Sequence, residues 1–173
     1  MFGFLFEDLI DSVLSENYVI AITLIIYGIG FIIMESLTRK PRLNDVAEFT
    51  FKTALIIGAF QVLALVPGTS RSGSTIIGAV AIGCSRAAAA EFSFFLAIPV
   101  MLGASGFKLL KSGLMFQSHE WIILILGMFV AFIVSVFAIK FLMGYIRRHD
   151  FKAFGWYRIV LGIVVLLYFY VIK

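Results

Sequence analysis

One short run of the sequence combines hydroxyl groups, glycines and an arginine in a pattern suited to phosphate. The run reads Pro67-Gly68-Thr69-Ser70-Arg71-Ser72-Gly73-Ser74-Thr75. A guanidinium binds two phosphate oxygens at once, glycines let backbone N–H groups approach an anion, and a helix that starts after the run turns its positive end toward the ligand. The hydroxyls add donors or a nucleophile. The run therefore predicts an anion-binding loop centred on Arg71.

Apolar stretches flank this loop on both sides, at residues 51–66 and 74–83. An arginine near the centre of a bilayer costs at least about 2.5–3.5 kcal/mol on insertion scales, so it requires a partner or a function. The alternative is a simple turn, with Ser72 or Ser74 capping the second helix and Arg71 reaching to the membrane interface. That alternative accounts for one charge but leaves the clustered hydroxyls unexplained, so we favour the functional interpretation.

Two carboxylates lie in or beside apolar stretches. Glu91 follows Arg86 by about one helical turn. It is a candidate to orient a metal ion or accept a proton, but an ion pair with Arg86, Lys52 or Arg71 is the favoured role. Glu35, near the end of an earlier apolar stretch, is expected to be a charge at the membrane interface.

The composition places these residues in a membrane. Hydrophobic residues make up 62% of the 173 positions and charged residues 14%, against roughly 45–50% and 25% in soluble domains. Four stretches approach the length of about 20 residues that a spanning helix needs, namely residues 19–36, 87–107, 121–145 and 154–172. Before them, apolar positions at helical spacing predict an amphipathic helix at the interface. We expect one all-α integral membrane domain over residues 1–173.

The remaining apolar stretch, residues 51–83, is predicted to form a re-entrant helix-loop-helix hairpin. At 1.5 Å per residue its arms would reach about 24 Å and about 15 Å, so the second falls short of the roughly 30 Å of hydrocarbon. Irregular backbone at membrane depth is tolerated where it is buried in protein or lines a wet cavity. The loop around Arg71 should therefore face such a cavity.

The basic residues indicate an orientation, because a re-entrant hairpin leaves and returns on the same side. Two full crossings would have the same parity, and only the short second arm argues against them. One face then carries Arg39, Lys40, Arg42, Lys52, Arg86, Arg147, Arg148 and Lys152. The other carries Lys108, Lys111, Lys173 and the acidic N-terminal segment. The first face is cytoplasmic by the positive-inside rule. Since these charges sit at the edges of apolar stretches, no nucleic-acid partner is expected.

The motif and its neighbours resemble a known family. The run from residue 65 to 75, followed by Ser85-Arg86 and by the segment Ala90-Glu91-Phe92-Ser93-Phe94-Phe95-Leu96-Ala97-Ile98-Pro99, is similar to the undecaprenyl pyrophosphate phosphatases of the bacitracin-resistance type. The resemblance runs in order from about residue 19 to the C-terminus.

The resemblance implies a multi-pass enzyme of the bacterial inner membrane. It would hydrolyse a C55 isoprenyl diphosphate to the monophosphate, recycle that lipid carrier for peptidoglycan synthesis and thereby give bacitracin resistance. It also implies Mg²⁺ or Ca²⁺ as a cofactor and no organic cofactor. The implied diphosphate-binding residues are Gly68, Thr69, Ser70, Arg71, Ser72, Gly73 and Ser74, with Arg71 and Ser70 catalytic and Glu91 a possible acid or base.

The sequence departs from this family in one large respect. Family members consist of two inverted repeats, and nothing here matches the glutamate-rich motif of the first repeat. The chain is thus expected to be one half of the fold, inactive alone or completed by the missing half or by a homo-oligomer. The alternatives left open are a membrane transporter or lipid flippase, suggested by helices broken near the midplane, and a non-enzymatic assembly subunit.

Overall fold

The computed structural model describes residues 17–37, 40–111 and 118–172, and its elements within these ranges are helices joined by short loops, without a β-strand. The elements in chain order are α2 (Asn17–Leu37), η1 (Val46–Glu48), α3 (Phe51–Gln61), η2 (Val62–Leu65), α4 (Arg71–Ala81), α5 (Arg86–Lys111), α6 (Ser118–Ile146) and α7 (Lys152–Ile172). The predicted N-terminal interfacial helix lies outside the described residues.

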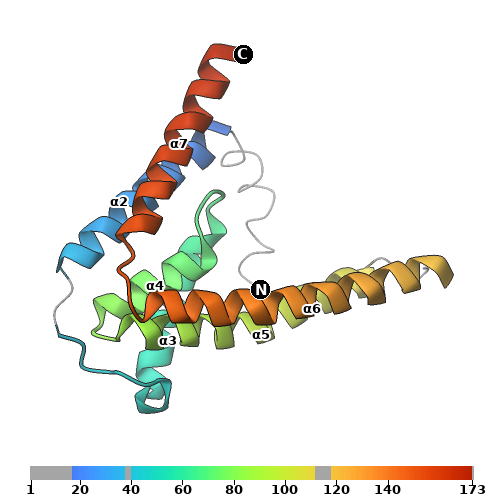
Figure 1. Cartoon of the computed structure of the whole chain (residues 1–173), viewed down its shortest axis with the longest axis horizontal. Helices are drawn as coiled ribbons and strands as arrows, with labels where there is room; N and C mark the ends of the chain where they lie inside the picture. Colours follow the sequence, from blue (N-terminus) through green and yellow to red (C-terminus); the bar gives the residue numbers. More distant parts are fainter. Residues whose placement is uncertain (1–16, 38–39, 112–117, 173) are drawn as a thin grey trace.

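Four of these helices are long and apolar enough to cross a membrane, which confirms the four predicted spans. They are α2, α5, α6 and α7. Figure 1 shows them as two pairs, α2 with α7 and α5 with α6, that diverge from a shared base. The buried core lies at this base, where Phe31, Ile57, Ala89 and Phe151 pack together. By contrast, α6 buries almost none of its apolar surface against the described residues.

The α2–α7 pair is held close by glycines. A side chain at Gly155 would lie 2.8 Å from the carbonyl oxygen of Gly28, and one at Gly162 would lie 2.8 Å from that of Ala21. Small residues at helix contacts let two backbones approach closely. In a membrane this close packing stabilises helix association, because lipid tails are as apolar as the side chains and no hydrophobic driving force acts between helices. The glycines therefore explain why α7 packs along the full length of α2.

A buried carboxylate ties three elements together at the base. Glu35 of α2 forms an ion pair with Arg86 at the start of α5 and accepts a hydrogen bond from the backbone N–H of Phe151, just before α7. Its side chain is only 2% exposed. The prediction of an interface charge at Glu35 was therefore wrong. Its two partners are distant in sequence, so no local pattern marked the position as buried.

The predicted helix-loop-helix is present, but its loop is shorter than expected. The first arm comprises α3 and η2, and α4 already begins at Arg71 instead of at Ser74. The cap is Ser70, whose Oγ accepts the Gly73 N–H at 3.1 Å, so the interpretation of Ser72 or Ser74 as the cap was wrong. Serine preceding a helix satisfies one of the first N–H groups. Arg71 thus lies on the first helical turn and not in the loop.

The tip of the hairpin rests against α2. Thr23 donates a hydrogen bond to the Pro67 carbonyl at 2.9 Å, and Ser74 donates to the Tyr27 hydroxyl at 2.8 Å. Gly68 has a φ of +84°, and a side chain there would lie 2.7 Å from the Ile20 carbonyl oxygen. Both the left-handed backbone and the close approach require glycine. These contacts fix the position of the hairpin tip along the axis of α2, beside Thr23 and Tyr27.

Substituting Gly68 by alanine is expected to destabilise the protein by at least about 2 kcal/mol, because it adds backbone strain and a steric clash with α2. Thermal unfolding of the detergent-purified protein measures this loss. Gly58→Ala in α3 is the matched control, since nothing lies within 4 Å of a side chain at that position, and its effect should stay within about 1 kcal/mol. Equal stability of the two variants would contradict the close packing of the tip.

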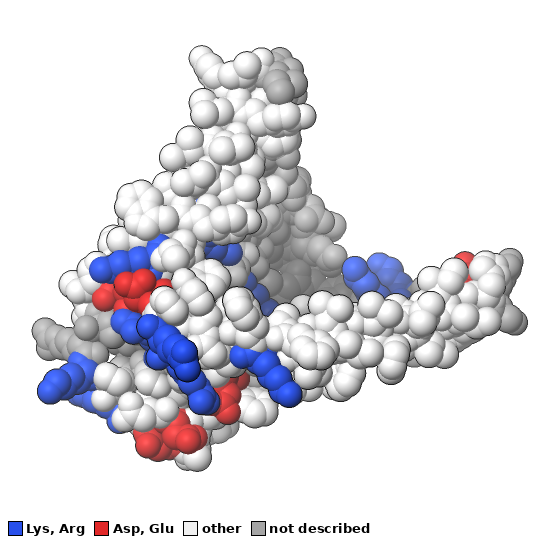
Figure 2. Space-filling view, viewed as in Figure 1, with Lys and Arg blue, Asp and Glu red and all other residues white. Residues whose placement is uncertain are grey.

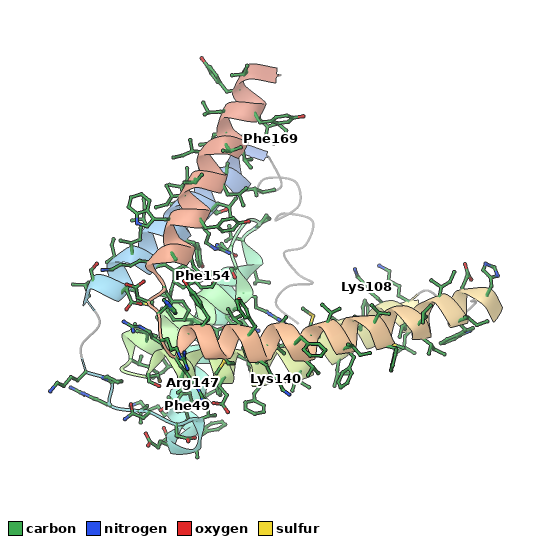
Figure 3. All side chains as sticks on the ribbon, viewed as in Figure 1. Phe49, Lys108, Lys140, Arg147, Phe154 and Phe169 are labelled. Atoms are coloured by element: carbon green, nitrogen blue, oxygen red, sulfur yellow. The ribbon has the colours of Figure 1, made fainter. Side chains whose placement is uncertain are left out.

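Basic side chains are concentrated at one end of the described structure. Figure 2 shows most of the visible lysines and arginines gathered at the shared base. In Figure 3, Arg147 lies at that base, whereas Lys108 lies far along the α5–α6 pair. The two residues belong to the two different faces predicted from sequence. The base therefore corresponds to the more basic face.

Candidate anion-binding site

The first turn of α4 presents unpaired positive charge. Arg71 occupies the first helical position, and its Nη1 atom is buried without a hydrogen-bond partner among the described residues. The Ser70 cap satisfies the N–H of Gly73, and the first bond between the helical turns is Ser74 N–H to the Ser70 carbonyl. The N–H groups of Arg71 and Ser72 belong to the first turn, which has no intrahelical acceptors. Guanidinium, free amides and helix dipole together favour an anion.

Only part of the hydroxyl cluster is available to a ligand. Thr69 donates to the Val66 carbonyl at 2.6 Å, which closes the turn after η2. Ser74 is 1% exposed and bonded to α2, and Thr75 donates to the carbonyl of Arg71. Ser70 and Ser72 remain, with their Oγ atoms 3.1 Å apart. Of the predicted binding residues, Thr69 and Ser74 thus have structural partners.

The two predicted glycines serve packing. Gly68 contacts α2, as described above. A side chain at Gly73 would lie 3.2 Å from the Phe31 ring, so glycine here lets α4 pack against α2. The backbone N–H of Gly73 already bonds to Ser70. Of these two glycines, Gly73 therefore does not offer an unoccupied N–H to a ligand.

A cavity of about 250 Å³ opens beside Ser70 and Ser72. Its walls come from α2, α4, α5, α6 and α7. The residues with polar side chains in this lining are Ser70, Ser72, Ser93, Tyr157 and Arg158. The Nη1 atom of Arg158 is buried and, like that of Arg71, lacks a partner among the described residues.

Sequence analysis missed Arg158 and Ser93. Arg158 lies inside the stretch predicted to span the membrane as residues 154–172. The energetic argument applied to Arg71, that a charge within a span needs a partner or a function, applies equally here. The signal for Arg158 was thus present in the sequence. Ser93 carried no comparable signal, because a single hydroxyl in an apolar helix is common.

The favoured ion pairs of Glu91 are absent. It forms none with Arg86, Lys52 or Arg71, all of which are described, because Arg86 binds Glu35 instead. Glu91 is half-buried and lines a separate groove of about 620 Å³ between α5 and α6, with Arg147 also in its lining. It does not line the cavity beside Ser70. The structure thus separates Glu91 from the hydroxyls that the sequence grouped with it.

The described residues offer no ready metal site. No three carboxylates, histidines or cysteines among them lie close enough together to hold one ion. Glu35 is engaged with Arg86 and Phe151. The predicted Mg²⁺ or Ca²⁺ therefore finds no preformed set of ligands in this part of the chain.

Comparison with known proteins identifies the family. Residues 1–164 match the family described as bacitracin resistance protein BacA. The chain is 59% identical to an undecaprenyl-diphosphatase of Acetivibrio thermocellus, covering 100% of this chain and 64% of the relative. It is 61% identical to undecaprenyl-diphosphatase 1 of Clostridioides difficile, covering 98% and 62%. An undecaprenyl-diphosphatase of Enterococcus faecalis is 62% identical, with 95% and 60% covered.

These matches extend over nearly the whole chain, but the chain spans less than two thirds of the length of each of these relatives. The matched region includes the loop before α4, the Ser70 cap and Arg71. The matched region also contains the run 65–75, Ser85-Arg86 and the segment 90–99, on which the resemblance depended. The chain belongs to the bacitracin resistance protein BacA family.

Proposed function

We propose that this protein takes part in the hydrolysis of undecaprenyl diphosphate to undecaprenyl phosphate and inorganic phosphate in the bacterial inner membrane. The observation that carries the proposal is the unpaired Arg71 guanidinium at the capped N-terminus of α4. The printed names of the relatives support it. The consequence would be recycling of the lipid carrier for peptidoglycan synthesis and resistance to bacitracin.

The neighbouring cavities favour an amphipathic substrate. The cavity beside Ser70 is lined by three serines, Tyr157 and Arg158, whereas the groove between α5 and α6 is mainly apolar. Phe94 lines both. A ligand with a charged head and a long apolar chain would place the head at α4 and direct the chain along the groove. An isoprenyl diphosphate has this chemistry, whereas a soluble phosphate ester lacks the chain.

In the proposed reaction, an oxygen nucleophile attacks the terminal phosphorus, and the bridging P–O bond breaks. Lipid monophosphate leaves with the bridging oxygen and its electron pair. Arg71 and the free N–H groups of α4 would stabilise the charge on the phosphoryl oxygens, which is the main catalytic requirement of phosphoryl transfer. No described histidine or carboxylate contacts Ser70, so we assign Ser70 to binding and leave proton transfer to another group.

Phosphate release from C55 isoprenyl diphosphate by the detergent-purified protein tests the function. Release above that of a mock purification, and its loss on addition of EDTA, would support hydrolysis and the proposed dependence on Mg²⁺ or Ca²⁺. Activity that survives EDTA would contradict that dependence. Tight binding of the diphosphate without any release would contradict turnover by this chain alone. If release were also absent on co-expression with the remaining part of a longer relative, the carrier or flippase alternative would be favoured.

We also propose that the α3–α4 hairpin is re-entrant. With 11 residues, α4 reaches about 16 Å, too short to cross a bilayer. Its end returns beside the segment before α3, where the Arg42 N–H donates to the Gly83 carbonyl at 2.8 Å. Ser74 in the first turn of α4 bonds to Tyr27, the central residue of α2. The tip would thus lie near mid-depth of the membrane.

Single cysteines at Arg42 and Arg147 are expected to react with a membrane-impermeant maleimide from the same side, and one at Lys111 from the opposite side. These three native side chains are exposed. The native Cys84 is 1% exposed, and burial raises the pKa of its thiol to about 11, so it should not compete. Labelling of Arg42→Cys and Arg147→Cys from opposite sides would exclude the re-entrant hairpin.

We further propose that the exposed apolar surface of α6 contacts additional polypeptide, as the second half of an inverted-repeat fold or as a second copy of this chain. The observation is that α6 buries almost none of its span within the described residues. Co-expression with the remaining part of a longer relative, followed by size-exclusion chromatography, tests this. If the chain expressed alone elutes only as a monomer, and co-expression with the remaining part does not change its activity, the proposed partner is contradicted.

A further inference from the structure

Arg158 is a half-buried cation without a counter-charge among the described residues. It lies in the second turn of α7, and its Nη1 atom is buried without a hydrogen-bond partner among the described residues. No carboxylate of the described residues forms an ion pair with it. Its electrostatic neighbours are the phenol groups of Tyr27 and Tyr157. A guanidinium held in this way is costly unless a ligand supplies the missing negative charge.

The surroundings of Arg158 supply further donors for an anion. It lines the cavity of about 250 Å³ together with Ser70 and Ser72 of the α4 N-terminus and Ser93 of α5. It is the one charged residue in the described lining of this cavity. The positive end of α4 adds to its field. Three separate elements thus direct hydrogen-bond donors or positive potential toward the same space.

A purely structural role explains these observations less well. A snorkelling arginine places its guanidinium in water at the interface, yet Nη1 of Arg158 is buried. A structural arginine in a membrane span pairs with an acid or with backbone carbonyls, as Arg86 does with Glu35. Arg86 thus pairs with an acid, whereas Arg158 has no acidic partner among the described residues.

We propose that Arg158 is a second phosphate-binding residue, which holds the diphosphate from α7 in the cavity that Ser70 and Ser72 also line. Arg71 lies in the same helical turn as Ser72 but outside the lining of this cavity. This inference rests on the proposed function. A diphosphate carries more than one negative charge, so a cation at this cavity in addition to Arg71 would neutralise it more completely. The same chemistry would bind the diphosphate of an isoprenyl lipid or free inorganic pyrophosphate, and the experiment separates the two.

Equilibrium binding of farnesyl diphosphate and of inorganic pyrophosphate to the detergent-purified protein provides the first test. Arg158→Gln should weaken binding about 10- to 100-fold, the value of a charge-assisted hydrogen bond, and Arg158→Lys should retain part of the affinity because it keeps the charge. Arg148→Gln, at an exposed arginine outside the cavity, is the matched control and should bind as the wild type does. Unchanged affinity of Arg158→Gln for both ligands would overturn the proposal.

A second measurement uses the wild-type protein and so does not depend on the folding of a variant. Phenylglyoxal modifies accessible guanidiniums, and mass spectrometry of the digested protein reports each site separately. Saturating diphosphate should slow modification of Arg158 at least about tenfold and leave Arg148 unchanged. An equal rate at Arg158 with and without ligand would refute the assignment even if Arg158→Gln fails to fold.

The two ligands distinguish failure of this inference from failure of the proposed function. Farnesyl diphosphate bound and hydrolysed independently of Arg158 would leave the function intact and exclude Arg158. Inorganic pyrophosphate bound through Arg158, without binding or hydrolysis of the isoprenyl diphosphate, would support the anion site and contradict the lipid substrate. Binding of neither ligand by the wild-type protein would overturn both.

Discussion

Replacing Arg71 by alanine is expected to reduce hydrolysis of an isoprenyl diphosphate by about 100- to 1,000-fold, the loss that follows removal of one preorganised donor from a phosphoryl or oxyanion site. The Nη1 atom of Arg71 is buried and has no hydrogen-bond partner among the described residues, so it remains available to donate to a ligand. Arg71→Lys should recover only a small part of the activity, because an ammonium cannot contact two oxygens in one plane. Phosphate release gives the rate, and equilibrium binding of farnesyl diphosphate gives the affinity.

The control for Arg71 is Arg148→Ala, which removes an exposed arginine at the basic base of the molecule. It changes the net charge by the same amount but should leave the rate unchanged. Near-normal activity of Arg71→Lys would show that a positive charge alone suffices and that bidentate hydrogen bonding to two phosphate oxygens is not required. Equal losses in Arg71→Ala and Arg148→Ala would show that the net charge of the surface, and not the position at α4, determines activity.

Replacing Glu35 by alanine is expected to lower the free energy of unfolding by about 3 kcal/mol. Breaking a buried ion pair typically costs 3–5 kcal/mol because it leaves a buried charge alone. Here the remaining partner, Arg86, is 39% exposed, so water can stabilise it and the loss should fall at the lower end. The backbone N–H of Phe151 also loses its acceptor. Thermal unfolding in detergent measures the change.

Glu35→Gln separates the two contributions, because an amide oxygen can still accept the Phe151 N–H but cannot pair with the Arg86 charge. Glu35→Gln should therefore lower the free energy of unfolding by about half as much as Glu35→Ala does. Glu48→Ala, at an exposed carboxylate of η1, should change stability by less than about 1 kcal/mol. If Glu35→Ala were as stable as Glu48→Ala, the ion pair with Arg86 would not hold the base together.

The Glu35 cluster also bears on the site. It fixes the start of α5, which carries Ser93, and the start of α7, which carries Arg158. Both residues line the cavity beside Ser70. Glu35→Ala should therefore weaken ligand binding as well as stability, whereas Gly68→Ala acts through the tip of the hairpin. Loss of binding in a Glu35 variant at temperatures where it remains folded would show this positioning effect.

The four membrane spans were predictable because a membrane imposes a length and an apolar composition that are visible locally. The hairpin was predictable in outline, since Pro67 and Gly68 interrupt an apolar run too short to cross twice. Its boundary was not. Serines at 70, 72 and 74 are all acceptable caps by type, and the choice of Ser70 depends on how α4 packs against Phe31 and Tyr27.

The sequence by itself determined which stretches are long and apolar enough to span a membrane, and it marked Ser70 to Ser72 as candidates for phosphate binding, because hydropathy, helix breaking and side-chain chemistry are local properties. Tertiary structure alone decided which charges are paired. Glu35 meets Arg86 across 51 positions and Phe151 across 116. Arg86 is then not available to Glu91, and Arg158 lies in the same cavity as Ser70 and Ser72. Pairing depends on which helix faces pack together, and packing is a property of the whole fold.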